Sequence, residues 1–305
     1  MLFAPLGENA VLRRLSLIGL LPLLLVAGHS RAADEAYAGE VREWQHQHET
    51  DVRTGPWLLL VGRYEVAPGA SSIGSDPAST IVLPDGAPPR LGVLTRTGSV
   101  FRFEPAQGVA VTIDGTPAAG VAELSTARGK GRAGVGSFSF AVRMIGDDYY
   151  LLAQDSQNPA VHNFKGTEWF PVDPAYRVRA EFVAYEHPQS VPVPMTRIES
   201  RTVMSSTGDV IFTLHGTQLR LKSFVDDDQL FIMFGDRTNG RETYGGGRFL
   251  HAPLPQNGVT TLDFNKAFNP FCSVNDYVVC PVVPTENRLT VSVTAGQKYH
   301  GGESR

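Results

Sequence analysis

The chain has 305 residues, of which 42% are hydrophobic and 19% are charged, and its formal net charge is −4. This length predicts about two domains with substantial cores, and the balance of residue types is that of a soluble globular protein. A mildly acidic chain lacks the basic surface that nucleic acids or anionic lipids require, so we expect no nucleic-acid partner. The 31 glycines and 21 prolines are spread along the chain, which favours many short strands over long helices.

The N-terminal residues have the pattern of a secretory signal peptide. Two arginines precede an apolar run over residues 15–27, and Ser30 and Ala32 place small residues at the two positions that signal peptidase reads. We therefore predict a signal peptide over residues 1–32 and an exported protein, periplasmic or extracellular. A membrane anchor fits less well, because the run is shorter than the roughly 20 residues of a span and Pro22 interrupts it. No transmembrane span is expected after cleavage.

The next segment, residues 33–55, is predicted to form an amphipathic helix. Apolar and aromatic side chains recur there at helical spacing, at Tyr37, Val41, Trp44 and His48. We expect this stripe to pack on the domain that follows. A second histidine lies two residues before His48, and a helix points such a pair in different directions. We interpret both histidines as solvated surface rather than as a metal site.

Residues 56–156 are predicted to form a β-sandwich. Short runs rich in Val, Ile, Phe and Tyr alternate there with turn sequences that contain Gly, Pro and Asp. Two of the longest runs cover residues 138–145 and 149–153.

Part of this sandwich is similar to a forkhead-associated domain. The similarity is carried by residues 73–76, 81–83 and 112–117, which match that fold's first loop, its next strand and a later turn. Such domains read phosphothreonine with an arginine where this chain has Ser75, and with a Ser-x-x-His segment where residues 88–91 read PPRL. A phosphate needs charge-assisted donors. We therefore expect a sandwich of similar shape without phosphopeptide binding.

Residues 157–300 are predicted to form a second antiparallel β domain, a barrel or a curled sheet. Strand-like runs continue as far as residues 289–294, and Asn-Gly pairs at 239–240 and 257–258 are strong hairpin-turn signals. Residues 207–209 also have the composition of a turn. The predicted fold class is therefore mainly β, with one helix followed by two β bodies.

Three segments near the C-terminus carry longer motifs. Residues 236–250 read DRTNGRETYGGGRFL, residues 262–270 read LDFNKAFNP and residues 286–289 read ENRL. These motifs resemble those of the DUF1684 family, a bacterial family of unknown function. The chain departs from the family pattern at its second cysteine, where a Cys-Pro-Leu-Pro-Pro run is typical and residues 280–284 read CPVVP. The resemblance implies a family and no particular activity.

The same stretch holds the candidate functional residues. They can form a buried network in which arginines pair with carboxylates and amides satisfy an irregular loop. They can also form a binding or catalytic pocket in which a carboxylate acts as acid or base. We favour the network and keep both alternatives open. The candidate binding or network residues are Asp236, Thr238, Tyr244, Arg248, Asp263, Asn265, Asn269, Glu286, Asn287 and Arg288.

The sequence supports a binding protein more than an enzyme. Cys272 and Cys280 are its two cysteines, and in an exported chain we expect them to form a disulfide. The chain has no nucleophile elbow, phosphate loop or dinucleotide fingerprint, and we predict no cofactor and no metal. The first hypothesis is an exported, non-catalytic β protein that binds a small molecule or a cell-envelope partner. The alternative is a hydrolase-type enzyme, which would require Asp236, Asp263 or Glu286 to converge on an open cleft.

Overall fold

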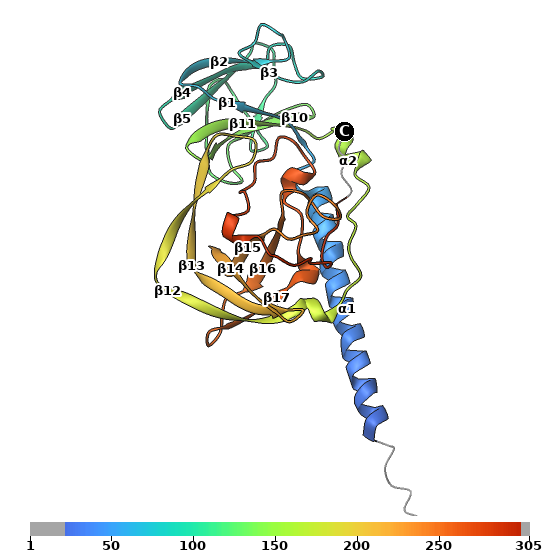
Figure 1. Cartoon of the computed structure of the whole chain (residues 1–305). Helices are drawn as coiled ribbons and strands as arrows, with labels where there is room; N and C mark the ends of the chain where they lie inside the picture. Colours follow the sequence, from blue (N-terminus) through green and yellow to red (C-terminus); the bar gives the residue numbers. More distant parts are fainter. Residues whose placement is uncertain (1–21, 300–305) are drawn as a thin grey trace, which may run out of the picture.

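The chain folds into two β bodies, and one long helix lies alongside the second of them (Figure 1). The structure, a computed structural model, describes residues 22–299, with side chains from residue 31 onward. Residues 1–21, which hold most of the predicted signal peptide, lie outside the described residues. The prediction of a mainly β fold with a helix ahead of it is confirmed.

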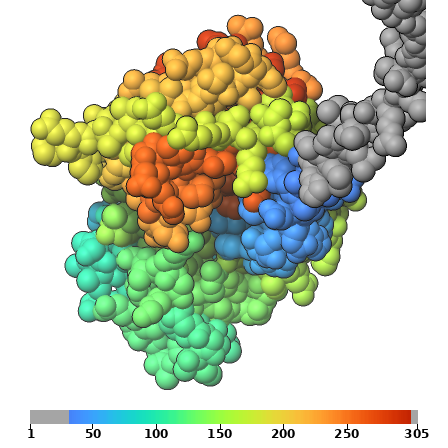
Figure 2. Space-filling view, turned by 90° about the horizontal axis from the view of Figure 1, so that it is seen from below, coloured from blue at the N-terminus to red at the C-terminus, as the bar shows by residue number. Residues whose placement is uncertain are grey.

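Helix α1 (Pro22–Thr54) packs against the rest of the chain with the stripe that the sequence predicts. Tyr37, Val41 and Val52 are buried, whereas residues 31–36 are exposed. In the space-filling view, the blue helix lies where the green first body meets the yellow-to-red second body (Figure 2). Among the described residues, no helix is both long enough and apolar enough to cross a membrane.

The first body consists of two sheets packed face to face around one core. Phe101 and Phe103 from one sheet and Phe140 and Leu151 from the other are all buried in this core. The rings of Phe103 and Phe140 meet edge to face, with their centroids 5.1 Å apart. The first sheet contains, in order, β1 (Leu60–Glu65), β11 (Asp148–Asp155), β10 (Phe138–Ile145), β9 (Arg132–Val135), β6 (Thr112–Ile113) and β7 (Thr116–Pro117), and the second contains β3 (Ile81–Val82), β2 (Gly69–Gly74), β4 (Gly92–Thr97), β5 (Val100–Pro105) and β8 (Ala122–Leu124).

The segment between the two bodies is tied down at both ends. It begins with the short helix α2 (Pro159–Asn163), where the Nδ2 of Asn158 donates to the carbonyl of Leu58 at 2.7 Å. Further along, the backbone N–H and the hydroxyl of Thr167 each donate to the carboxylate of Glu49 on α1, at 3.1 Å. The segment therefore connects the first body to the helix as well as to the second body.

The second body is a six-stranded antiparallel sheet that curls into a nearly closed barrel, as the sequence predicts. Its two longest strands, β12 (Arg177–Pro194) and β13 (Arg201–Leu214), extend past the barrel towards the first body (Figure 1). The sheet contains, in order, β16 (Arg248–Pro253), β15 (Gln229–Phe234), β14 (Thr217–Asp226), β13 (Arg201–Leu214), β12 (Arg177–Pro194) and β17 (Val259–Asp263). Short 3-10 turns lie at Pro174–Tyr176, Phe264–Lys266, Phe271–Ser273 and Thr285–Asn287.

Two local predictions for this body are wrong. Residues 207–209, predicted as a turn, lie inside β13, because Gly208 leaves room for a neighbouring ring. A Cβ at Gly208 would lie 2.5 Å from the ring of Phe182, so the glycine permits close packing rather than a turn. Residues 289–294, predicted as a strand, form no named strand, and they contribute Leu289 and Val293 to the core.

The turn at residues 257–258 is confirmed. Asn257 and Gly258 both have positive φ, 51° and 76°, as the Asn-Gly hairpin turn requires. Residues 239–240 belong to an irregular loop between β15 and β16. That loop ends at Gly247, whose φ of 93° and close approach to the carbonyl of Phe234 leave no room for a side chain.

Strand β15 is buried on both faces, because residues 230–234 are all apolar and all lie in the interior. Leu230, Ile232 and Phe234 belong to the core inside the barrel, and the alternate residues Phe231 and Met233 belong to a second cluster outside it. Side chains from α1, β1 and the loop between the two cysteines complete this outer cluster. The strand therefore joins the barrel, the helix and the first body.

His48 lies in this outer region, so its predicted solvated position is wrong. Its ring stacks on Trp44 with centroids 5.3 Å apart and packs against Phe268 at 5.0 Å. Burial is the main reason that the pKa of His48 falls to about 4. His46, the second histidine of the pair, is exposed as expected.

We predict that His48 makes the protein less stable as the pH falls from about 6.5 towards 4. In that range the unfolded chain binds a proton at His48 while the folded chain does not, and the total effect is up to roughly 3 kcal/mol. The free energy of unfolding in urea, measured at several pH values, should fall less steeply in a His48→Phe variant than in wild type. His46→Phe is the control and should keep the wild-type slope. Identical slopes for all three proteins would contradict the prediction.

Candidate functional site

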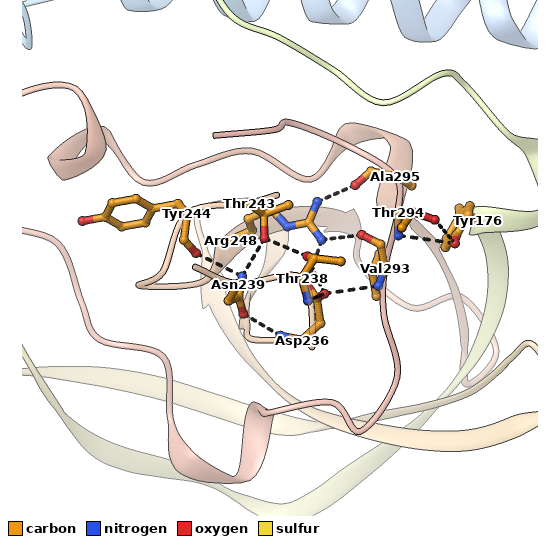
Figure 3. Close-up of polar contacts among 10 residues, drawn as sticks. All are labelled: Tyr176, Asp236, Thr238, Asn239, Thr243, Tyr244, Arg248, Val293, Thr294 and Ala295. Atoms are coloured by element: carbon orange, nitrogen blue, oxygen red, sulfur yellow. Dashed lines mark hydrogen bonds and ion pairs between the residues drawn. The ribbon is translucent and has the colours of Figure 1, made fainter. Parts of the chain in front are cut away.

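The centre of the predicted polar stretch is a buried ion pair (Figure 3). The Nη2 of Arg248 lies 2.8 Å from Asp236 Oδ2, and both side chains are 0% exposed. Arg248 lies opposite Phe234 in the β15–β16 pair, so the ion pair lies at one end of the barrel. The guanidinium also donates to the carbonyls of Val293, at 2.8 Å, and Ala295. Burial lowers the pKa of Arg248 and the Asp236 carboxylate opposes that shift.

The second carboxylate oxygen of Asp236 is also occupied. Its Oδ1 accepts from the backbone N–H and the hydroxyl of Thr238, at 2.8 and 2.6 Å, and from the N–H of Val293 at 3.2 Å. Asn239 extends the network, because its Oδ1 accepts from the N–H of Asp236 and its Nδ2 donates to the hydroxyl of Thr243. The carboxylate thus holds the loop and the C-terminal segment in place.

Asp263 and Asn265 form a separate network that fastens α1 to the barrel. Asp263 Oδ1 accepts from the hydroxyl of Tyr37 at 2.7 Å. Asn265 Nδ2 donates to the same hydroxyl and to the carbonyl of Asp173, each at 2.9 Å. Burial, together with the Asp263 carboxylate, raises the pKa of Tyr37. These contacts join residues that lie far apart in the sequence.

The last candidate residues divide into buried and exposed. Asn287 is fully buried, and its side chain bonds the N–H and carbonyl of Lys222 and the carbonyl of Met233, at 2.7 to 2.8 Å. Glu286 and Arg288 are exposed, and neither side chain has a hydrogen-bond or ion-pair partner within residues 22–299. Asn287 therefore satisfies the backbone of the neighbouring strands.

The prediction of a disulfide is wrong. Cys272 and Cys280 are free, buried thiols. Their loop brings the sulfurs together as hydrogen-bond partners, and the N–H of Cys272 donates to the Sγ of Cys280 at 3.3 Å. The hydrogen bond from Cys280 lowers the pKa of Cys272 to about 7, and it raises the pKa of Cys280. The hydroxyl of Tyr244, whose own pKa burial raises to about 12, lies 3.9 Å from the Cys272 sulfur.

The three candidate carboxylates do not form a catalytic cleft. The Asp236 carboxylate is buried at one end of the barrel and pairs with Arg248. The Asp263 carboxylate accepts a hydrogen bond from Tyr37 of the helix, and Glu286 is exposed. Within the described part of the chain, no group of three or more His, Cys, Asp or Glu side chains is arranged to hold a metal ion. The polar stretch is chiefly a structural network.

A cavity of about 470 Å³ lies on the first body, beside the loop at residues 73–76. Arg90 is the one basic residue among those that line it, and Asp76 and Glu104 line it as well. A phosphate would require several converging donors. This geometry does not favour phosphopeptide recognition.

A larger cavity, of about 610 Å³, lies where the first body, the linking segment and the cysteine loop meet. Its lining comes from Pro84 and from residues within 58–61, 158–168, 269–277 and 297–299. Its size falls in the usual range for small-molecule sites. Of the candidate residues, Asn269 lines this cavity.

Hydrogen bonds between the two bodies hold the walls of this cavity. The Nδ2 of Asn275 donates to the carbonyl of Leu60 at 2.9 Å. Arg63 on β1 donates to the carbonyl of Tyr277 at 2.8 Å. The cysteine loop is therefore docked on the first body, which pre-forms the cavity.

Asn269 is the unusual group in this cavity. It is 4% exposed, its N–H donates to Gln297 Oε1 at 2.8 Å, and its Nδ2 donates to the carbonyl of Lys298 at 2.9 Å. Its Oδ1 is buried with no hydrogen-bond partner among the described residues. Gln297 and Lys298 carry no signal in the sequence, because no local pattern places the C-terminal segment beside Asn269.

Comparison with known proteins places the chain in a family. Residues 162–298 match the model of a family described as "Protein of unknown function (DUF1684)". The chain belongs to the DUF1684 family. The matched segment contains the ion pair and most of the lining of the larger cavity, and the first body contributes the remaining wall.

One solved structure similar to this DUF1684 chain is the solution NMR structure of an uncharacterized protein from Haloarcula marismortui. The two are 34% identical over 45% of this chain and 78% of that chain, with a TM-score of 0.39. A search of curated proteins finds no match.

We predict that Asp236→Asn lowers the free energy of unfolding by roughly 3–5 kcal/mol, because it leaves the Arg248 guanidinium buried without its counter-charge. Arg248→Ala should cost a similar amount for the converse reason. Arg288→Ala is the control, and this exposed change should stay within about 0.5 kcal/mol of wild type. Urea unfolding of the four proteins measures these differences. Equal stability of Asp236→Asn and Arg288→Ala would show that the pair is not buried.

Proposed function

We propose that this DUF1684 protein is a non-catalytic binding protein that holds a small ligand in the 610 Å³ cavity between its two bodies. The observation that carries the proposal is the buried, unpartnered Oδ1 of Asn269 in the wall of that cavity. A buried carbonyl oxygen without a partner loses free energy relative to a hydrogen-bonded one, and a ligand that donates to it restores that energy.

The arrangement of the carboxylates supports binding over catalysis. A hydrolase would need an acid and a base near one reacting atom. Asp236 is instead saturated by Arg248 and backbone amides, and Asp263 is bonded to Tyr37. No contact within the described residues favours the enzyme alternative.

We predict that ligands of the cavity raise the melting temperature of wild type and not that of a variant with a filled cavity. Ala160 lines the cavity from α2 and is half-buried, so Ala160→Trp should fill the space while keeping the backbone bonds of the helix. A ligand at 100 times its Kd stabilises by about 2.7 kcal/mol, enough for a shift of several degrees. The measurement is a thermal-shift screen of sugars, amino acids, acylated amino acids and nucleosides.

The matched control for this screen is Ala119→Trp, at an exposed position outside the cavity. It should respond to ligands as wild type does. Ligands that stabilise all three proteins equally would place binding elsewhere, and a screen without any hit would count against the proposal.

We also propose that the protein is exported and acts in the periplasm or outside the cell. The signal-peptide pattern over residues 1–32 supports this, as does the position of the packing stripe on α1. The first buried residue of the described helix is Tyr37, so cleavage after Ala32 would spare every described buried contact.

Export predicts a mature chain that begins at Ala33. Mass spectrometry of the protein recovered from the cell envelope or the medium should give the mass of residues 33–305. Recovery of the full-length chain from the cytoplasm alone would rule out the export proposal.

A further inference from the structure

We propose that the ligand of the larger cavity carries a secondary amide, which the side chains of Asn269 and Gln297 bind through its N–H and its carbonyl. This inference rests on the proposed function and specifies the chemistry of the ligand. The reason is that some polar atoms of the cavity wall have hydrogen-bond partners and others have none.

The free group of Asn269 is an acceptor. Its amide orientation is set by its neighbour, because the nitrogen must face the carbonyl of Lys298, to which it donates at 2.9 Å. The oxygen is left buried and without a hydrogen-bond partner within the described residues, in a residue that is only 4% exposed. A ligand N–H is the group that satisfies it.

The free group of Gln297 is a donor. Its Oε1 must face the backbone N–H of Asn269, from which it accepts at 2.8 Å. Its Nε2 makes no hydrogen bond within residues 22–299, although Gln297 is 6% exposed and lines the same cavity. A hydrogen bond joins the two residues, and both line the same cavity. A secondary amide offers an N–H for the Asn269 oxygen and a carbonyl for the Gln297 nitrogen.

The charges around the cavity favour an uncharged recognition group. Lys298 is paired with Glu168 at 2.9 Å. Asp276 is paired with Arg197 at 2.7 Å, and Lys165 is exposed. At Lys298 and Asp276, a ligand carboxylate or ammonium group would have to compete with these pairs, whereas an amide would not.

The remaining lining accommodates an apolar or ring-shaped body. Leu58, Leu60 and Val274 supply aliphatic surface, and Tyr277 and Tyr299 supply aromatic surface. A cavity of this size holds a ligand of a few residues or sugar rings. The amide could therefore come from an acylated amino acid or short peptide, or from an N-acetylated sugar.

The test measures binding of matched probes to the full chain by isothermal titration calorimetry. The peptide arm compares N-acetyl-alanine methylamide with methyl O-acetyl-lactate, in which oxygen replaces both N–H groups. The sugar arm compares N,N′-diacetylchitobiose with cellobiose, which lacks the acetamido groups. In the arm that contains the natural chemistry, the amide should bind at least about tenfold more tightly than its partner, because the partner lacks the amide N–H that pairs with the Asn269 oxygen.

A protein variant tests the donor separately. Gln297→Glu keeps an oxygen for the N–H of Asn269 and replaces the free Nε2 by a second oxygen, so it should weaken amide binding by about tenfold or more. Gln218→Glu adds the same charge at an exposed position of β14 and should bind as wild type. The probe comparison uses only wild type, so it stands even if Gln297→Glu is too unstable to assay.

The outcomes separate this inference from the proposed function. Equal affinity for amide and matched probe in both arms, or no binding of either amide, would overturn the inference and leave an ordered water as the partner of Asn269. A ligand of another class that stabilises wild type and not Ala160→Trp would then still support a binding protein. Amide binding that Ala160→Trp leaves unchanged would also overturn the inference, because it places the amide outside this cavity.

Discussion

The buried ion pair between Arg248 and Asp236 is the interaction on which the second body depends. Removing two charges from water is costly, and hydrogen bonds to both groups offset much of that cost. Within the described residues, the Nε of Arg248 is the one polar side-chain atom of the pair without a partner. Here the partners come from the end of β15, the start of β16 and the C-terminal segment at Val293 and Ala295. The pair therefore fixes the position of a segment that forms no strand of its own.

That fixed segment leads directly to the cavity. Two residues beyond Ala295 lies Gln297, whose side chain accepts from Asn269, and Lys298 follows it. The position of the free amide groups is thus a consequence of the ion pair. Most polar side chains in residues 236–288 hold the second body together. The Asn269 oxygen, which is free for a ligand, lies at the edge of that network, where the second body meets the first.

Strand β15 explains why the two bodies and the helix form one unit. Its alternate side chains enter the barrel core and the outer cluster, so neither face is available to solvent. The outer cluster includes Trp44 of α1 and Leu60 of β1. Because the cavity is built across this junction, the DUF1684 segment by itself would lack one wall of it.

The sequence by itself determined the features that depend on local pattern. Helical spacing predicted the buried stripe of α1, and an Asn-Gly pair predicted the turn at 257–258. Only the tertiary structure decided the burial of His48, the free state of Cys272 and the meeting of Asn269 with Gln297. Each of these depends on which distant segments pack together, and periodicity along one strand or helix carries no information about that.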